Sequence, residues 1–363
     1  MEKTVSLVIV EDCNLNCSYC YEHHKTNKLI SVDLAKEILY KELTEDDEYD
    51  DVYIDFFGGE PFLAFNIIKE LFDYIKAIST NKKYTIYSTT NGTLIHGSIQ
   101  KWLKENKDDF VCGLSIDGNR EMHNYNRSNL FDNIDLSFFY RMWPDQPVKM
   151  TITPKSLNTL ADGVIYLHEE GFKVSCNLAY GYNWNDSNLE VVLKRELSKL
   201  IDYYLSHPDI EICTMLDHKI EYLTNSENEI YKKWCGVGTG MRVYSTDGEL
   251  YPCQFFTPLS IGEELSKKAK SLNFCRDISL CEIDVQCQEC VFLKICPTCM
   301  GHNYFVNENI YHKDLSMCQL TKIMFYATSY LKGELLVKNK LILENDELYN
   351  LINGIKIVQD HIN

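Results

Sequence analysis

Three cysteines lie close together near the start of this chain, and their spacing constrains the fold more than any other feature. Cys13, Cys17 and Cys20 follow the pattern C-x3-C-x2-C, so one loop can direct all three sulfurs towards a single point. A [4Fe-4S] cluster usually takes four thiolates, and ferredoxin-type sequences supply the fourth nearby. The next cysteine here is Cys112. The spacing therefore predicts a cluster with one iron left for a ligand that is not part of the protein.

The other interpretations of this segment, which we call the cysteine loop (residues 11–22), are structural. Three buried cysteines or a disulfide loop would not require this spacing. A zinc site would need a second cysteine pair nearby, and the sequence has none there. An iron–sulfur cluster is the interpretation that accounts for the pattern.

Composition excludes several classes of protein. The chain has 363 residues, 45% of them hydrophobic, which is enough for a large α/β domain and a smaller one. The formal net charge of −17 argues against nucleic acid or an anionic membrane as the main partner. The fifteen cysteines are an odd number, and no signal peptide or membrane-spanning apolar stretch is present. We therefore predict a cytoplasmic protein whose cysteines bind metal in a reducing compartment.

Strand-like segments alternate with helical segments over the first two hundred residues, which is typical of a parallel α/β array. The six predicted strands are residues 5–10, 52–57, 84–88, 111–116, 148–153 and 172–178. Six such units are too few for a closed eightfold barrel. We therefore predict an α/β fold in which residues 1–206 form a partial (β/α)6 TIM-like barrel.

Polar and glycine-rich segments follow the first four predicted strands, and in such barrels the loops at these ends converge on one mouth. Gly58-Gly59-Glu60-Pro61 follows the second strand, and adjacent glycines let a backbone approach a ligand closely. Thr90 and Asn91 follow the third strand, and Asp117 follows the fourth. These loops are predicted to form one site with the cysteine loop, although a glycine pair or an Asp-Gly pair also suits an ordinary turn.

A second group of cysteines lies near the other end of the chain. A run with the spacing C-x2-C-x5-C-x2-C is preceded by two cysteines and followed by one. These residues are Cys235, Cys253, Cys287, Cys290, Cys296, Cys299 and Cys318. Paired C-x2-C cysteines also suit a zinc ribbon. Because the cysteine loop is present in the same chain, we predict iron–sulfur clusters here as well.

The cysteine loop, with the sequence Cys-Asn-Leu-Asn-Cys-Ser-Tyr-Cys-Tyr, resembles that of the radical S-adenosylmethionine (SAM) superfamily, and its peptide-modifying members in particular. The resemblance covers about residues 4–320. It implies the partial barrel, and it implies that SAM binds the open iron and is cleaved to a 5′-deoxyadenosyl radical. The cofactor then carries the chemistry and the protein supplies position.

The same resemblance implies roles for single residues. Gly58-Gly59-Glu60 matches the motif that binds the SAM amino group, Arg127 matches an arginine that pairs with the SAM carboxylate, and Ser115 matches another SAM contact. Tyr19 matches an aromatic residue that packs on the adenine. Weaker candidates for SAM contacts are Thr90, Asn91, Asp117 on the ribose side, and Leu178, which suits an ordinary core position equally well.

The C-terminal cysteines resemble the SPASM extension of radical SAM peptide maturases, in which seven cysteines hold two auxiliary [4Fe-4S] clusters. Two departures are a longer gap between Cys235 and Cys253 and a shorter final pair. The resemblance implies that auxiliary cluster I is held by Cys235, Cys253 and Cys299, and auxiliary cluster II by Cys287, Cys290, Cys296 and Cys318. Substrate or solvent, or else Cys275 or Cys281, takes the fourth position of auxiliary cluster I. With the cysteine loop, this makes three clusters.

The predicted organisation has four parts. Residues 1–206 form the radical SAM barrel, and residues 207–234, which are polar and acidic, form a linker. Residues 235–320 form the SPASM auxiliary-cluster domain, and residues 321–363 form a C-terminal helical tail.

The resemblance implies an oxidoreductase that abstracts a hydrogen atom from a residue of a ribosomally synthesised precursor peptide. The radical then closes onto a neighbouring side chain in a thioether or carbon–carbon cross-link. A sulfatase maturase, which oxidises serine or cysteine to formylglycine, is the alternative. Those enzymes carry an aspartate base after the cysteine that Cys253 matches, whereas this chain has Gln254, whose amide cannot take up a proton.

Two further alternatives remain. A peptide epimerase needs a hydrogen-atom donor, for which Cys176 and Cys213 are weak candidates, because cysteines in such positions are more often small buried hydrophobes. A non-catalytic iron–sulfur electron carrier or redox sensor needs clusters but no SAM pocket, so Gly58–Pro61, Ser115 and Arg127 argue against it.

The predicted partners follow from the same resemblance. They are a precursor peptide, and a flavodoxin or ferredoxin as electron donor. Few residues precede the first strand, so we expect no N-terminal leader-binding domain; a separate recognition protein or the barrel surface is expected to bind the leader. The acidic composition favours a basic leader.

Overall fold

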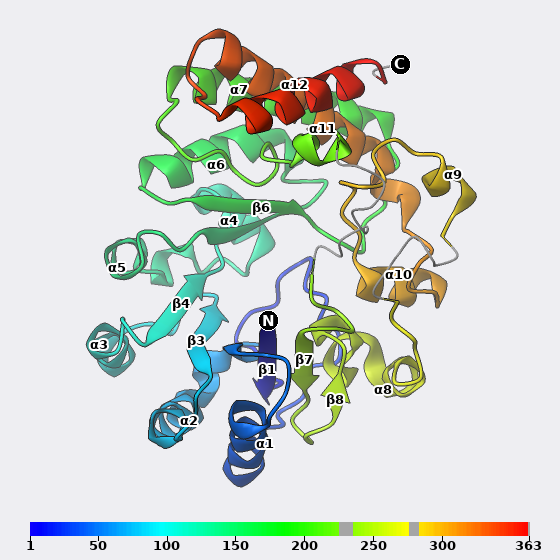
Figure 1. Cartoon of the computed structure of the whole chain (residues 1–363). Helices are drawn as coiled ribbons and strands as arrows, with labels where there is room; N and C mark the ends of the chain where they lie inside the picture. Colours follow the sequence, from blue (N-terminus) through cyan, green and yellow to red (C-terminus); the bar gives the residue numbers. More distant parts are fainter. Residues whose placement is uncertain (225–234, 276–282, 362–363) are drawn as a thin grey trace. The chain divides into compact units, whose positions relative to one another are not determined.

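The computed structural model describes residues 1–224, 235–275 and 283–361 (Figure 1). Contacts within the chain divide it into two compact units, each discontinuous in sequence. Unit 1 contains residues 1–116, 123–146 and 235–276, and unit 2 contains residues 117–122, 147–234 and 277–363. This division differs from the predicted one, because it splits the predicted barrel and the cysteine-rich segment between the two units.

Unit 1 is built on a six-stranded sheet with the order β4-β3-β2-β1-β7-β8. Its strands are β1 (Glu2–Val10), β2 (Asp51–Gly58), β3 (Lys83–Thr90), β4 (Phe110–Leu114), β7 (Met241–Tyr244) and β8 (Leu250–Tyr251). Neighbouring strands from β4 to β7 are parallel, and β8 is antiparallel to β7. The carboxyl ends of β1 to β4 therefore point the same way, as the predicted site requires.

Helices connect the strands of unit 1 and cover one side of them (Figure 1). They include α1 (Val32–Thr44), α2 (Phe65–Ala77), α3 (Gly97–Glu105), α5 (Leu136–Met142) and α8 (Pro258–Ala269), whereas α4 (Arg120–Asn126) begins in unit 2 and ends in unit 1. Buried apolar side chains of α1 and α2, such as Leu39 and Ile68, match the period of an amphipathic helix. Each fully buried side chain of this size contributes about 1.5–3 kcal/mol.

Unit 2 contains a two-stranded parallel sheet of β5 (Val148–Ile152) and β6 (Val174–Leu178). Its helices are α6 (Leu160–Glu169), α7 (Ser187–Ser206), α9 (Val285–Gln288), α10 (Met300–Asn307), α11 (Cys318–Val337) and α12 (Asn345–Gln359). Helix α11 packs against both α7 and α12 (Figure 1). The predicted helical tail is therefore part of the packed structure of this unit.

Residues 207–224, the described part of the predicted linker, belong to unit 2. Ile220 and Leu223 lie in the short 3-10 helix η4 (Ile220–Thr224), which packs on α12. Both side chains are buried in an apolar cluster with Phe292, Ile295, Phe325, Leu351 and Val358. The polar composition of this segment did not indicate that two of its apolar residues are buried. Residues 225–234 lie outside the described residues.

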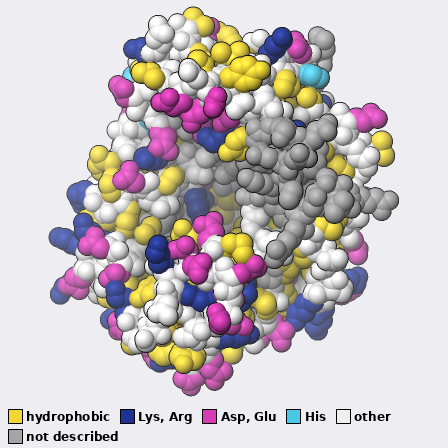
Figure 2. All heavy atoms as spheres, viewed as in Figure 1, with side chains coloured by type: hydrophobic (Ala, Val, Ile, Leu, Met, Phe, Trp, Pro, Cys, Tyr) yellow, Lys and Arg dark blue, Asp and Glu magenta, His cyan; other side chains and the backbone are white. Residues whose placement is uncertain are grey.

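The prediction of an α/β fold with a mostly parallel sheet is confirmed. All six predicted strands are present, the first four in the sheet of unit 1 and the last two in the sheet of unit 2. No helix in the described part of the chain has the length and apolar character needed to cross a membrane. Acidic and basic side chains are interspersed over the described surface that Figure 2 shows.

Candidate functional site

The cysteine loop follows β1 and is held by hydrogen bonds to neighbouring segments of unit 1. The backbone N–H of Glu60 donates to the carbonyl of Asp12 at 2.9 Å, and the N–H of Ser18 donates to the carbonyl of Asn126 at 2.9 Å. The three cysteine side chains of the loop are half-buried. The protein itself therefore sets the conformation of the loop, because these bonds connect it to the β2 end and to α4.

The two glycines after β2 are required by the closeness of the cysteine loop. Gly58 has φ 137°, and a Cβ atom there would lie 1.9 Å from the carbonyl oxygen of Val10. A Cβ on Gly59 would lie 2.3 Å from the carbonyl oxygen of Asp12 and 2.9 Å from the Cβ of Cys13. Any side chain at either position would push the two loops apart. The role of this motif in binding the SAM amino group stays a prediction.

Glu60 is buried, with 1% of its surface exposed, and its carboxylate joins the loops after β2 and β3. It accepts hydrogen bonds from the Thr90 hydroxyl at 2.7 Å, the Asn91 N–H at 2.8 Å and the Phe62 N–H at 3.2 Å. Burial raises the pKa of Glu60 to about 7, although these bonds and the charge of Arg127 act in the opposite direction. The Glu60 side chain thus fixes the loops and is directed at protein groups.

Arg127 and the side chains around it lie at the same end of the sheet. The guanidinium carbon of Arg127 is 5.3 Å from the centre of the Tyr19 ring, a cation–π contact. Asn91 donates from its side-chain amide to the side-chain oxygen of Asn14 at 2.9 Å. The N–H of Ser115 donates to the carbonyl of Thr90 at 2.9 Å. Unit 1 therefore brings together eight of the ten predicted SAM contacts, namely Tyr19, Gly58, Gly59, Glu60, Thr90, Asn91, Ser115 and Arg127.

The other two predicted contacts belong to unit 2. Asp117 is fully buried, and its carboxylate accepts a hydrogen bond from the N–H of Thr151 in β5 at 2.9 Å. Leu178 ends β6 and lies, nearly buried, at the wall of a cavity in unit 2. Asp117 thus contacts β5 near the carboxyl end of the strand, and a SAM contact for either residue stays a prediction.

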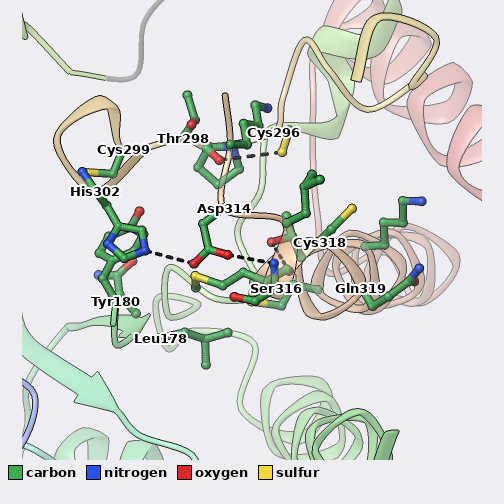
Figure 3. A pocket seen from close by; sticks show the side chains of 18 of the residues that line it. Leu178, Tyr180, Cys296, Thr298, Cys299, His302, Asp314, Ser316, Cys318 and Gln319 are labelled. Atoms are coloured by element: carbon green, nitrogen blue, oxygen red, sulfur yellow. Dashed lines mark hydrogen bonds and ion pairs between the residues drawn. The ribbon is translucent and has the colours of Figure 1, made fainter. Parts of the chain in front are cut away.

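The cavity in unit 2 has a volume of about 630 Å³ and is lined by five of the predicted cluster ligands (Figure 3). The five are Cys287, Cys290, Cys296, Cys299 and Cys318. Cys287 lies in the short helix α9, and Cys290 and Cys296 lie in the segment after it. Cys299 is the N-cap of α10, and Cys318 is the first residue of α11. Cysteines that are far apart in the sequence therefore face one space.

Two polar residues in this cavity were not predicted. His302 is 2% exposed, and its Nε2 atom lies 3.0 Å from a carboxylate oxygen of Asp314 (Figure 3). The Tyr180 ring lies 4.7 Å from the His302 ring, centre to centre. The only signal in the sequence was that His302 follows Cys299 by three residues.

In unit 1, Lys25 is a further residue that the sequence did not indicate. Its Nζ atom lies 3.3 Å from the sulfur of Cys20.

The cysteines of the chain suit clusters of several irons better than single metal ions. Four sulfurs around one tetrahedral zinc ion lie about 3.8 Å apart, because each Zn–S bond is about 2.3 Å. Within the described residues, three ligand atoms approach within 4.8 Å of one another in one group alone, Glu42, Glu45 and Asp47. Those carboxylates already pair with Lys3, Lys82 and Arg242. The cysteine sulfurs are thus spread more widely than one zinc ion requires, and thiolates are the ligands of iron–sulfur clusters.

The remaining cysteines differ in position. Cys176 lines the cavity of unit 2, and the buried Cys213 donates its N–H to the Tyr204 hydroxyl at 3.0 Å. Burial raises the pKa of both thiols, so both stay protonated. Cys235, Cys253 and Cys275 belong to unit 1 and Cys299 to unit 2, so the ligand set of auxiliary cluster I stays a prediction; Cys281 lies outside the described residues.

An α/β sheet with a cysteine loop after its first strand defines a class of metal-dependent enzymes. The profile of the radical SAM superfamily matches residues 7–195, more than half of the chain. The chain belongs to the radical SAM superfamily. This membership implies an enzyme of oxidoreductase-type radical chemistry that uses SAM and a [4Fe-4S] cluster.

Relatives and solved structures narrow the comparison. An uncharacterized protein of Methanocaldococcus jannaschii is 28% identical over 74% of this chain and 90% of its own length. The cysteine-type anaerobic sulfatase-maturating enzyme of Clostridium perfringens is 25% identical over 78% of this chain and 84% of its own. The structure of native anSMEcpe with bound AdoMet and Cp18Cys peptide matches with a TM-score of 0.70 at 21% identity, over 93% of this chain and 99% of that one.

One further structure extends the fold comparison. SuiB of Streptococcus suis bound to precursor peptide SuiA matches with a TM-score of 0.58 at 16% identity, over 88% of this chain and 76% of that one. At such identities the likeness to solved structures shows the fold alone. The sequence relatives connect the chain with the sulfatase-maturating enzymes, so the predicted relationship to these maturases is confirmed.

Proposed function

We propose that this enzyme modifies a ribosomally synthesised precursor peptide, abstracting a hydrogen atom from one residue and closing the product as an intrapeptide thioether or carbon–carbon cross-link. The observation that carries the choice of a cross-link is Gln254, which stands directly after Cys253. An amide at this position accepts a hydrogen bond but cannot take up a proton. A reaction that needs a base here is therefore disfavoured.

The residues of unit 1 would hold the cofactors of this reaction. Cys13, Cys17 and Cys20 would bind a [4Fe-4S] cluster, and bound SAM would supply the hydrogen-abstracting radical. Arg127 would pair with a carboxylate, because its guanidinium stays charged and lies beside the ring of Tyr19. The backbone at Gly58-Gly59 would approach the cofactor closely, since no side chain separates it from the cysteine loop.

The cavity of unit 2 would hold auxiliary cluster II on Cys287, Cys290, Cys296 and Cys318. Auxiliary cluster I would use Cys235, Cys253 and Cys299. A cross-link removes two hydrogens from the peptide: one would leave as a hydrogen atom taken by the radical derived from SAM, and the other as a proton released to solvent and an electron. An auxiliary cluster would accept this electron, and a flavodoxin or ferredoxin would supply the electron that starts the reaction.

A second candidate function is formylglycine formation. Similarity to the C. perfringens enzyme over more than three quarters of the chain favours it. The peptide-bound structure of anSMEcpe shows that this fold accommodates a peptide substrate. The amide of Gln254 argues against it, for the reason given above.

The test uses protein purified and reconstituted without oxygen, with SAM and a chemical reductant. Two peptides are compared: the short peptide encoded beside the gene and the Cp18Cys peptide. Loss of two hydrogens from the first peptide, mapped by fragmentation to a residue pair, is the expected result. An aldehyde in Cp18Cys, detected with a hydrazine reagent, would establish formylglycine formation instead. Deuterium uptake from heavy water without a mass change in light water would indicate an epimerase.

Two controls separate the remaining alternatives. Release of 5′-deoxyadenosine from SAM is expected from the reduced protein, and its absence would leave an electron carrier or sensor. A purified protein that holds zinc and no iron would overturn the proposal. Binding of the unmodified precursor to the isolated enzyme, measured by titration calorimetry, decides whether a separate leader-recognition protein is required.

A further inference from the structure

Gln254 lies beside the cysteine loop in unit 1. It belongs to the 3-10 helix η5 (Gln254–Phe256), and the next residue, Phe255, stacks on the ring of Tyr21 with centres 5.1 Å apart and planes 11° apart. Tyr21 directly follows the last cysteine of the loop. The N–H of His24 also donates to the carbonyl of Leu259 at 3.0 Å. These contacts fix the segment that carries Gln254 against the predicted cluster site.

The side chain of Gln254 is connected to the sheet through a second residue. Its amide nitrogen donates to the hydroxyl oxygen of Ser6 in β1 at 3.1 Å. The Ser6 hydroxyl donates in turn to a carboxylate oxygen of Asp55 in β2 at 3.0 Å. Ser6 is fully buried and Asp55 is 4% exposed, so the bond between them is shielded from bulk water. Ser6 and Asp55 are also paired in the register of the two strands, so the sheet holds them side by side.

The chemistry of this chain of bonds fixes which way the Gln254 amide points. A serine hydroxyl has one hydrogen to donate, and an ionised carboxylate only accepts. The hydrogen of Ser6 is therefore committed to Asp55, and the Ser6 oxygen must accept. It can accept only from the nitrogen of the Gln254 amide, so the amide oxygen is directed away from the sheet. Without Asp55, the amide would be able to turn over at little cost.

We propose that Gln254 is a substrate-binding residue whose amide oxygen accepts a hydrogen bond from an N–H or O–H group of the peptide. Ser6 and Asp55 are positioning residues that act through Gln254. This inference rests on the proposed function and deepens it. It assigns substrate recognition to the position where the resemblance to the sulfatase maturases implies a base. The substrate it selects presents a hydrogen-bond donor next to the attacked residue.

The test is a double-mutant cycle with Ser6→Ala and Gln254→Ala, using the precursor peptide encoded beside the gene. Loss of one substrate hydrogen bond is expected to raise KM for the peptide about tenfold in Gln254→Ala and about fivefold in Ser6→Ala. The double variant is expected to match Gln254→Ala alone, because Ser6 acts only through the amide. An approximately fiftyfold rise in the double variant, the product of the single effects, would overturn the positioning role, and an unchanged KM in Gln254→Ala would overturn the binding role.

A substitution outside the buried strand β1 tests whether a rise in KM comes from misfolding. Gln254→Glu keeps an oxygen towards the peptide but presents a second acceptor to Ser6, so its KM is also expected to rise; a wild-type KM would contradict the inference. Ser88→Ala is the matched control, because Ser88 is equally buried in β3 and donates to the Phe56 carbonyl at 2.7 Å without reaching Gln254. Its KM is expected to stay at the wild-type value.

Failure of the inference and failure of the proposed function are distinguishable. If the wild-type enzyme does not modify the peptide, the proposed function is wrong. If it does, and Ser6→Ala and Ser88→Ala have the same KM, the proposed function stands and the inference is wrong. Melting temperature and iron content of each variant show that the compared proteins are folded and loaded alike.

Discussion

The two cysteine-rich regions of this enzyme are built in opposite ways. In the cysteine loop, three cysteines lie within one short segment, and backbone bonds from β2 and α4 hold that segment in place. In unit 2, five cysteines between Cys287 and Cys318 come from short helices and turns and face a cavity of about 630 Å³. In the cysteine loop, hydrogen bonds to the rest of unit 1 position the cysteines. In unit 2, the cysteines surround a cavity.

This difference indicates in which region metal binding would contribute to the stability of the fold. The backbone hydrogen bonds that connect the cysteine loop to Glu60 and Asn126, and the glycine contacts at Gly58 and Gly59, do not involve the sulfurs, so the loop is expected to keep its conformation without metal. Short helices such as α9, with four residues, have little stability of their own. Metal bound by the cysteines of unit 2, as proposed above, would therefore contribute its binding energy to folding. We expect the loss of a cysteine from the cysteine loop to abolish the activity of the enzyme. We expect the loss of a cysteine from unit 2 to reduce the stability of the protein.

The strongest test of this comparison is a pair of cysteine substitutions. Cys17→Ala is expected to lower the release of 5′-deoxyadenosine by more than about a thousandfold, because the radical step depends on the bound cofactor. Its melting temperature is expected to stay within about 3 °C of wild type. Cys296→Ala is expected to retain SAM cleavage but to lose about four irons per chain and melt at least about 5 °C lower.

The matched control is Cys112→Ala, which removes a buried sulfur from β4 that no predicted cluster uses. It is expected to keep both its iron and its activity. Iron analysis, calorimetry and chromatographic detection of 5′-deoxyadenosine supply the readouts. A larger loss of melting temperature in Cys17→Ala than in Cys296→Ala would break the comparison.

The sequence predicted those features whose signals are local. Strand-like segments between helical ones located all six strands, and the spacing of the cysteines and glycines located the loops that meet after β1 and β2. The sequence did not predict the bond from His302 to Asp314 or the chain from Gln254 to Asp55. Gln254 and Ser6 are 248 residues apart, and no periodic pattern connects such positions. Contacts of this kind depend on the tertiary fold.

The predicted linker shows a related difference between composition and packing. A polar composition predicted a linker at residues 207–234, but two buried residues, Ile220 and Leu223, outweigh many exposed polar ones in deciding where a segment packs. The function of Glu60 was also only half predicted. Its motif indicated a ligand site, whereas its carboxylate bonds to the loop after β3.

A second prediction concerns the contact that holds the cysteine loop. Gly59→Ala would place a Cβ atom 2.3 Å from the Asp12 carbonyl oxygen, and backbone on both sides leaves no flexible group to move. We expect SAM cleavage to fall by about a hundredfold, because displacement of the loop by about 1 Å misplaces the reacting groups. The melting temperature is expected to fall by several degrees.

Gly113→Ala in β4 is the control, since its nearest neighbour would be 3.5 Å away, an ordinary contact. Activity and melting temperature are expected to be close to wild type in this variant. If Gly59→Ala kept full activity, the cysteine loop would be free to move, and its contrast with unit 2 would be smaller than we infer.

The smallest expected effect lies in unit 2, where His218 is half-buried at the wall of the cavity and its Nε2 atom is buried without a hydrogen-bond partner among the described residues. Its ring meets the Phe325 ring edge to face, with centres 4.8 Å apart, and Lys332 donates to its carbonyl at 2.9 Å. Burial, helped by the charge of Lys332, lowers the pKa of His218 from 6.5 to about 4. The folded state therefore holds a neutral ring where the unfolded chain would bind a proton.

The sign of the pH effect follows from this difference. Because the folded pKa is depressed, the stabilisation is fully present above pH 6.5 and is lost progressively as the pH falls towards 4. The loss is of the order of 1–3 kcal/mol. We expect His218→Gln to reduce the slope of melting temperature against pH between 6.5 and 4.5, and His312→Gln, at an exposed position, to leave it unchanged. Calorimetry at matched iron content measures both slopes. Equal slopes in wild type and His218→Gln would mean that acid weakens unit 2 through groups other than His218.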